Sequence, residues 1–296
     1  MKHLEGRTAF VTGGASGIGL SMARSFGRAG MNVVVADIDP EAIKVALADL
    51  HARQVKAIGV ECDVASRTSV ERAAQEALDE YGKVHVVCNN AGVGVGGPIE
   101  DMRPKDWNWI VDVNLMGVVY GTEVFVPIMR AQGEGGHFVN TASMAGMVSP
   151  PGMEPYTATK FAVVAMSEGW RGQLEPLDIG VSVLCPGFVK TRIHESGRAR
   201  QEEYGETVPA EDADMTGAAE FVLNGLDPDR VGARVLEAVR DNELYIFTHP
   251  DMRPAVEARF SDIMAAFDRA EQSEALQGSG YVSPQDLSTV GQKAEA

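Results

Sequence analysis

Cysteine is scarce in this chain of 296 residues, and its three cysteines lie in or at the ends of apolar, strand-like segments: Cys62, Cys88 and Cys185. Such cysteines usually pack as small hydrophobic side chains, so we expect no redox role and no metal site. Long apolar runs are missing as well, since Glu123 interrupts the apolar stretch 117–129. Because Glu5 and Arg7 also precede the first strand-like segment, we expect a cytoplasmic protein with no signal peptide and no membrane partner.

Basic residues are outnumbered, with 26 Lys and Arg against 42 Asp and Glu and a formal net charge of −16 at pH 7. Binding to a phosphate backbone depends on clustered Lys and Arg, so this balance disfavours a nucleic-acid partner. The apolar fraction of 45% is ordinary for a globular protein and is enough to build a sizeable core.

Short apolar runs alternate with longer helical stretches from residue 8 to about 190. The expected strands are 8–11, 32–36, 56–60, 84–88, 137–140, 181–185 and a later one at 244–248. Most are continuously apolar, as in strands buried on both faces of a parallel sheet. Crossover helices are expected at 16–29, 66–81, 106–130 and 156–174. This pattern predicts an α/β, Rossmann-type doubly wound sheet. We expect one domain over 1–278, followed by a polar tail at 279–296.

The composition changes between residues 190 and 225. Residues 201–220 contain seven carboxylates and neither Lys nor Arg. Such a charge run is usually a solvated face, but its place after a late strand also makes it a candidate lid. We therefore expect a lid insertion near 190–225.

A glycine-rich turn follows the first expected strand and opens the first expected helix. It has the spacing G-x-x-x-G-x-G, not the G-x-G-x-x-G of the commoner dinucleotide fingerprint. Gly13, Gly17 and Gly19 remove side chains where the backbone must turn sharply and approach a pyrophosphate. The helix N-terminus, at Ser16 and Ile18, then offers free N–H groups and the positive end of its dipole. We predict that these five residues bind the cofactor.

Asp37 ends the second expected strand, eighteen residues after Gly19. A carboxylate here can accept hydrogen bonds from the adenosine ribose hydroxyls and would repel a 2′-phosphate. No Arg or Lys immediately follows Asp37 or precedes Gly17. The sequence therefore favours NAD over NADP.

Two further strand ends fit the same cofactor. Asp63 and Val64 end the third strand, where a carboxylate could meet the adenine amino group. Asn90, Ala91 and Gly92 end the fourth, where small residues let the chain pass close to the ligand. Each signal is weak alone, but ligands of open α/β sheets bind at successive carboxyl ends of strands.

We expect the acid/base chemistry to come from a tyrosine and a lysine in the first turns of an expected helix. Tyr156 and Lys160 are four residues apart and so share one face of that helix. A phenol has a reference pKa of about 10, and a neighbouring ammonium is expected to lower it. Ser143 follows the fifth strand, where its hydroxyl could hold a substrate oxygen. Asn114 is an amide inside an expected helix, where asparagine is mildly unfavourable.

Together these residues resemble the short-chain dehydrogenase/reductase family, in its compact single-domain branch. The glycine turn, the N-N-A-G stretch at 89–92, the serine thirteen residues before the tyrosine, the Y-x-x-x-K pattern and a Pro-Gly pair occur in the family's order. The likeness covers roughly residues 5–250 and implies roles for individual residues. Tyr156 would be the proton donor and acceptor, and Ser143 would position and polarise the carbonyl. Lys160 would tune Tyr156 and bind the nicotinamide ribose, while Asn114 would support a water relay to Lys160. The nicotinamide would be lined by Pro186, Gly187, Val189 and Thr191.

A narrower resemblance concerns I-H-E-S-G at 193–197 and L-Y-I-F-T-H at 244–249. These segments are similar to the bacterial branch that includes Cα-dehydrogenases of lignin-derived β-aryl ethers, which oxidise benzylic alcohols with NAD. The residues expected to face the substrate are apolar, which suits a bulky or aromatic molecule: Gly94–Gly97, Met144, Met147, Pro150, Pro151, Met153, Phe188 and Ile193. The methionines could equally fill gaps in the core. Arg192 and His194 could attract an anionic substrate or form surface salt bridges.

We predict an NAD-dependent oxidoreductase that interconverts a secondary alcohol and a ketone, with Tyr156 as the acid/base. One alternative is an NADPH-type ketoacyl-thioester reductase, against which Asp37 and the acidic stretch 201–220 argue. The other is a catalytically silent dinucleotide-binding protein, against which Ser143, Tyr156 and Lys160 argue. In the family that the chain resembles, helices equivalent to 106–130 and 156–174 usually pack against their copies in another subunit. The resemblance therefore implies a homodimer or homotetramer.

Overall fold

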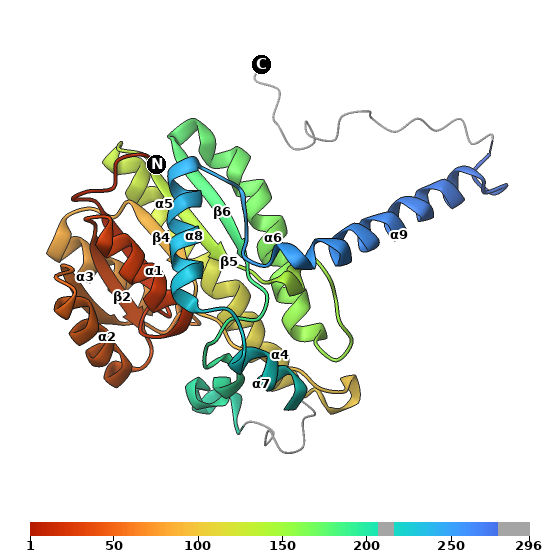
Figure 1. Cartoon of the computed structure of the whole chain (residues 1–296), viewed down its shortest axis with the longest axis horizontal. Coiled ribbons are helices and arrows are strands. Elements are labelled where there is room, and N and C mark those ends of the chain that lie inside the picture. The colour runs from red at the N-terminus through yellow and green to blue at the C-terminus, as the bar shows by residue number, and fades with distance from the viewer. Residues whose placement is uncertain (207–215, 278–296) are drawn as a thin grey trace. The chain divides into compact units, whose positions relative to one another are not determined.

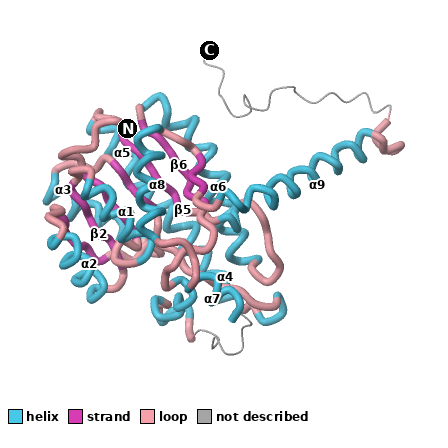
Figure 2. Tube along the Cα trace, in the orientation of Figure 1, coloured by secondary structure: helices cyan, strands magenta, loops and turns pink. Residues whose placement is uncertain are grey.

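The structure is a computed structural model that describes residues 1–206 and 216–277. Its centre is a sheet of seven parallel strands in the order β3-β2-β1-β4-β5-β6-β7, with helices on both faces (Figures 1 and 2). The strands are β1 (Thr8–Thr12), β2 (Asn32–Asp37), β3 (Ala57–Glu61), β4 (Val86–Asn89), β5 (Gly136–Thr141), β6 (Ile179–Cys185) and β7 (Tyr245–Phe247). The predicted Rossmann-type fold is confirmed, and each expected strand is present within two residues of its expected bounds.

Helices connect the strands. They are α1 (Gly17–Arg28), α2 (Pro40–Ala52), α3 (Arg67–Tyr81), α4 (Pro104–Val111), α5 (Gly117–Gln132), α6 (Glu154–Leu174), α7 (Thr216–Leu223), α8 (Pro228–Asp241) and α9 (Arg253–Glu271). The single helix expected at 106–130 is interrupted, because a π-helical turn at Asp112–Met116 separates α4 from α5. A π-turn inserts one extra residue per turn and is common at functional sites.

The strands are mainly apolar because helices bury both sides of the sheet. In β1, Phe10 packs against Phe125 of α5, with their ring centres 4.8 Å apart. The next residue, Val11, points to the other face and joins a core cluster with Met22 of α1 and Val235 of α8. This alternation of buried faces produces the continuous apolar runs seen in the sequence.

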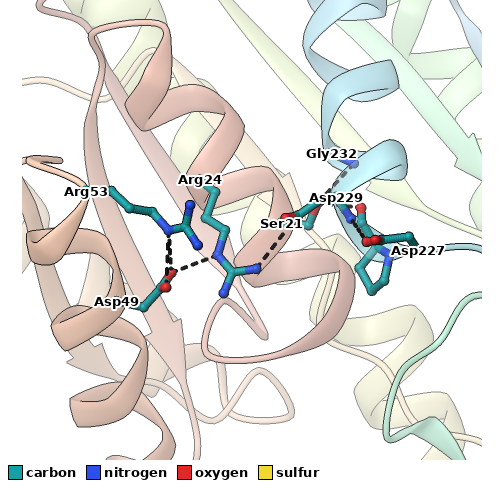
Figure 3. Close-up of polar contacts among 8 residues, drawn as sticks. Ser21, Arg24, Asp49, Arg53, Asp227, Asp229 and Gly232 are labelled. Atoms are coloured by element: carbon teal, nitrogen blue, oxygen red, sulfur yellow. Dashed lines mark hydrogen bonds and ion pairs between the residues drawn. The ribbon is translucent and has the colours of Figure 1, made fainter.

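Helices α1 and α8 are joined by a polar network (Figure 3). The Ser21 hydroxyl donates to the Pro228 carbonyl and accepts from the Gly232 N–H at 3.1 Å. Arg24 of α1 bridges Asp49 of α2 at 2.7 Å and Asp229 of α8 at 3.1 Å. These contacts fix the orientation of α1, the helix that begins at the glycine turn.

By contacts, the chain divides into two compact units, Met1–Met252 and the segment from Arg253 onward. In the second unit, α9 has exposed apolar side chains at Phe260, Met264 and Phe267, at helical spacing. The predicted domain boundary at 278 lies at the edge of the described residues and stays a prediction, and the tail 279–296 lies outside them. Within the described residues, the stretch Pro104–Gln132 is long and apolar enough to cross a membrane by length and composition alone, and half of its apolar 18-residue window is buried inside the protein.

Candidate active site

A cavity of about 630 Å³ lies at the carboxyl ends of the strands, where open α/β sheets bind their ligands. It brings together most of the predicted site residues: Gly13, Ser16, Gly17, Ile18, Asp37, Asp63, Val64, Asn90, Ala91, Gly92, Ser143, Tyr156, Lys160, Pro186, Gly187, Val189 and Thr191. Gly19 and Asn114 do not form part of its wall. The predicted residues therefore line one continuous pocket, from the glycine turn to the tyrosine.

The glycine turn has the geometry of a phosphate-binding loop. Gly13 and Gly17 adopt positive φ values of 59° and 53°, a left-handed conformation that favours glycine. A side chain at Gly19 would lie 2.0 Å from the Gly13 carbonyl oxygen, so this glycine closes the turn and does not line the pocket. The Ser16 hydroxyl makes no capping bond to α1, which leaves the first turn of that helix available to an anion.

Asp37 lies at the end of β2 beside this turn. Its carboxylate accepts hydrogen bonds from the Ala15 N–H at 3.0 Å and the Asp39 N–H at 3.2 Å. Burial raises the pKa of Asp37, and the backbone hydrogen bonds oppose that shift. Each bonded oxygen keeps a second lone pair, so the carboxylate can still accept ribose hydroxyls.

Asn90 holds the glycine turn to the end of β5. Its side-chain amide donates to the carbonyls of Thr12 at 3.0 Å and Gly13 at 3.3 Å. Its side-chain oxygen accepts a bond from the Thr141 hydroxyl at 3.3 Å, at the end of β5. This one residue therefore joins the ends of β1, β4 and β5.

Gln201 is a site residue that the sequence reasoning missed. Its side-chain amide donates to both carboxylate oxygens of Asp63 at 3.0 Å, and its oxygen accepts the Trp109 indole N–H at 3.0 Å. It lies inside the acidic stretch, and no sequence signal distinguishes it from a solvated residue. Gln201 lines the cavity at the end where we expect the adenine to bind.

The segment around Gln201 is packed against α4. Arg200 forms an ion pair with Asp106 at 2.8 Å, and the side chain of each is only 4% exposed. The Tyr204 hydroxyl donates to the Asp112 carboxylate at 2.8 Å. The predicted lid is thus an ordered wall over 193–204, while its part at 207–215 lies outside the described residues. Whether this segment opens stays a prediction.

Tyr156 and Lys160 share one face of α6 and are both buried, at 8% and 3% exposure. The Lys160 ammonium donates to the Thr141 carbonyl at 3.0 Å. Burial lowers the pKa of Lys160 to about 8. Burial raises the pKa of Tyr156, and a hydrogen bond with Ser143 only opposes that shift. The expected lowering of the Tyr156 pKa is wrong here, because desolvation of the phenolate outweighs the other effects.

Asn114 lies in the π-turn and is fully buried. Its side-chain oxygen accepts the Val93 N–H at 2.8 Å, and its amide donates to the Val93 carbonyl at 2.9 Å. Both Asn114 Oδ1 and Lys160 Nζ approach Gly92, at 3.2 and 3.5 Å from where its side chain would begin. These two bonds satisfy the buried amide, which is why an asparagine is tolerated inside this helical region. They also tie the π-turn between α4 and α5 to the loop after β4.

The substrate side of the cavity is mainly apolar. Of the residues expected there, Gly94, Met144, Pro150, Met153, Phe188 and Ile193 line it, whereas residues 95–97, Met147 and Pro151 do not. Arg192 and His194 also line the cavity, and each lies within ion-pair distance of Glu195. That favours the salt-bridge interpretation over a site for an anionic substrate.

The three cysteines are packed in the interior as small side chains. Cys62, Cys88 and Cys185 are buried and unpaired, and burial raises the pKa of Cys62 and Cys185 to about 12. Among the described residues, no group of three His, Cys, Asp or Glu side chains is arranged to hold a metal ion.

The arrangement can be compared with known proteins. A family model described as short chain dehydrogenase matches residues 7–202. A Cα-dehydrogenase of Sphingobium sp. (strain NBRC 103272 / SYK-6) is 38% identical over 266 residues, which cover 89% of this chain and 87% of that protein. The predicted likeness to the Cα-dehydrogenase branch is therefore confirmed.

Two further similarities extend over most of the chain. A 1-deoxy-11-beta-hydroxypentalenate dehydrogenase of Streptomyces exfoliatus is 36% identical, over 88% of this chain and 90% of that protein. The crystal structure of a short chain dehydrogenase/reductase from Burkholderia phymatum in complex with NAD matches with a TM-score of 0.86 and 38% identity, covering 90% of this chain and 97% of that one. The chain belongs to the short-chain dehydrogenase family of oxidoreductases.

Proposed function

We propose that this protein is an NAD-dependent dehydrogenase that interconverts a secondary alcohol and a ketone, with Tyr156 as the general acid/base. The observation that carries the proposal is the juxtaposition, in one cavity, of a glycine turn with Asp37 at one end and Ser143, Tyr156 and Lys160 at the other. The first group suits an adenosine diphosphate, and the second suits the oxygen of an alcohol or ketone.

The residues present fit a nicotinamide dinucleotide. A side chain at Gly13 would meet Ala91 at 2.9 Å and one at Gly17 would meet Thr191 at 3.0 Å, so glycine at both positions lets the turn pass close to the cavity wall, and the α1 N-terminus has no side-chain cap. When bound, the cofactor would supply the acceptor for the hydride that leaves the carbinol carbon. Asp37 supports NAD over NADP because a 2′-phosphate would meet a carboxylate there. The Burkholderia structure, which holds NAD, supports the same choice.

The chain's own residues would move the proton. Ser143 would donate a hydrogen bond to the substrate oxygen. The Tyr156 oxygen would accept the alcohol proton as the carbonyl forms, while its own phenolic proton would pass to the Lys160 amine. Because burial brings the pKa of Lys160 to about 8, its side chain can exchange a proton near neutral pH and pass it on from Tyr156. Asn114 holds the adjoining backbone at Val93 and so keeps this end of the cavity in shape.

The substrate we propose is bulky and apolar, and aromatic alcohols are the first candidates. Met144, Met153 and Phe188 supply the wall on this side, and Arg192 and His194 beside them lie within ion-pair distance of Glu195. The relative named Cα-dehydrogenase agrees with an alcohol carbon next to a larger group. A cytoplasmic homo-oligomer without nucleic-acid or membrane partners remains our prediction.

A spectrophotometric screen tests this function. Secondary alcohols, aromatic and aliphatic, are offered with NAD and NADP in parallel, and the appearance of the reduced cofactor is followed by its absorbance. We expect turnover with NAD and a bulky aromatic alcohol. Turnover only with NADPH and a ketoacyl thioester would overturn the proposal, as would tight NAD binding without turnover of any alcohol or ketone.

A further inference from the structure

The turn that lines the cavity at Pro186–Val189 is held from the side of β7 by one imidazole. His249 follows β7, at the end of the L-Y-I-F-T-H segment, and is half-buried. Its Nδ1 lies 3.1 Å from the Gly187 nitrogen, and its Nε2 lies 3.1 Å from the Phe188 carbonyl oxygen. A single side chain thus contacts two successive residues of the turn.

These hydrogen-bond partners determine which nitrogen of the His249 imidazole carries the hydrogen. The Gly187 N–H can only donate, so Nδ1 must accept; the Phe188 carbonyl can only accept, so Nε2 must carry the hydrogen. The Thr248 hydroxyl, 2.8 Å from Nδ1, is consistent with this tautomer because it can donate to the same nitrogen. Neutral His249 satisfies every one of these contacts, whereas a second proton at Nδ1 would face the Gly187 N–H.

The imidazole also explains the glycine in the turn. A side chain at Gly187 would begin 2.8 Å from His249 Cγ and 2.8 Å from Met252 Sδ. Gly187 does not have a positive φ, so its backbone conformation does not demand glycine. The residue is glycine because the His249 ring occupies the space of its side chain.

The same turn is attached to the catalytic serine on its other side. The Pro186 carbonyl accepts the Met144 N–H at 2.9 Å and the Ser143 hydroxyl at 3.5 Å. The Phe188 carbonyl that meets His249 also accepts the Leu226 N–H at 2.9 Å. The turn therefore lies between Ser143 on one side and His249 on the other.

We infer that His249 is a positioning residue, which holds the Pro186–Val189 turn against the nicotinamide end of the cofactor and so sets the place of the ring relative to Ser143 and Tyr156. This inference rests on the proposed function, because it needs a nicotinamide in this cavity. It predicts that His249 matters for the nicotinamide half of the ligand and not for the adenosine half, which binds at Asp37 and the glycine turn.

The test compares two ligands that differ only by the nicotinamide. Isothermal titration measures the dissociation constants of NADH and ADP-ribose for the wild type, His249→Phe and His249→Asn. Phenylalanine keeps a ring against Gly187 but loses both hydrogen bonds. Asparagine keeps an acceptor near the position of Nδ1 and loses only the reach to Phe188. His51→Phe is the matched control, because the His51 ring bonds the Ala57 carbonyl at 3.0 Å and does not line the cavity.

For His249→Phe we expect NADH to bind about 10-fold more weakly, as for the loss of two ordinary hydrogen bonds, with ADP-ribose within about twofold of the wild type. His249→Asn should recover part of the NADH affinity, and His51→Phe should change neither ligand. In steady state, His249→Phe should raise the KM for NAD and lower kcat. Unchanged NADH affinity, or an equal loss for both ligands, would overturn the inference. If the wild type binds neither ligand, the proposed function fails instead.

Discussion

The Lys160 ammonium lies 5.4 Å from the centre of the Tyr156 ring, one helical turn further along α6. Burial acts on the two groups in opposite directions: it raises the pKa of the phenol and lowers that of the ammonium to about 8. Both shifts favour the uncharged forms. Because the Lys160 side chain can gain or lose a proton near neutral pH, the pair is arranged to exchange a proton with the substrate oxygen through Tyr156, which the first prediction tests.

Tyr156→Phe should reduce turnover by about 10²- to 10⁴-fold, because it removes the proton acceptor and little else. The affinity for NADH should stay within about twofold of the wild type, as measured by quenching of protein fluorescence. Ser143 and the glycine turn are untouched by this change. A variant that turns over at a near-normal rate would show that the acid/base lies elsewhere.

Asp37→Ala should relax the proposed preference for NAD over NADP, because it removes the carboxylate that we expect to accept the ribose hydroxyls. The measurement is the ratio of kcat/KM for the two cofactors. Asp39→Ala is the matched control: its carboxylate caps α2 through the N–H groups of Glu41 and Ala42, so its loss should cost about 1 kcal/mol of stability and leave the ratio alone. An unchanged ratio in Asp37→Ala would place the ribose elsewhere.

Gln201→Glu should weaken the binding of ADP-ribose by about 5- to 10-fold, because it sets a second carboxylate beside Asp63, where the amide now donates at 3.0 Å. Gln75→Glu makes the same change in a surface pair, where the Gln75 amide donates to Asp79 at 2.7 Å on α3. That control should bind ADP-ribose normally. Equal affinities in all three proteins would remove Gln201 from the cofactor site.

Gly19→Ala should weaken cofactor binding and destabilise the fold, because the new methyl group would meet the Gly13 carbonyl oxygen at 2.0 Å. Gly169→Ala on α6 is its counterpart, since nothing lies within 4 Å of the added carbon. The counterpart should gain up to about 1 kcal/mol from helix propensity. Thermal melting with and without NADH separates the two effects, and a normal ligand-induced shift in Gly19→Ala would contradict the role of this turn.

His137 should make the protein acid-sensitive. Burial lowers its pKa to about 3, and its Nε2 lies 2.8 Å from the Ser182 hydroxyl oxygen. The unfolded chain binds a proton at about pH 6.5 and the folded one does not, so stability falls as the pH drops below that value. Between pH 7 and pH 5 the free energy of unfolding of the wild type should fall by about 2 kcal/mol more than that of His137→Gln, measured by urea unfolding. The same loss in both proteins would assign the acid sensitivity to other groups.

The sheet and the cofactor end could be predicted because their signals are local. Strands buried on both faces are apolar at most positions, and a glycine turn that approaches a phosphate needs glycine at particular positions. The π-turn that holds Asn114, the Gln201–Asp63 contact and the His249 imidazole could not be found this way. Each depends on which distant segment packs beside it. The sequence alone indicated only a helix around Asn114, a solvated stretch around Gln201 and the end of a strand at His249. The direction of the Tyr156 pKa shift was missed for the same reason, since burial is a property of the folded chain.

The amide of Asn90, bonded to Thr12, Gly13 and Thr141, limits how this enzyme can be recombined with its relatives. A hybrid could take the glycine turn from one parent and the segment with Ser143 and Tyr156 from another. Its Thr12 and Gly13 would then come from a different parent than its Thr141, although Asn90 contacts all three. Crossovers should therefore keep positions 12, 90 and 141 from one parent, or from parents in which the same three side chains recur. When enzymes with new coenzyme preferences are made by recombination, the contacts of the Asn90 side chain therefore restrict the crossover positions more than the strands do.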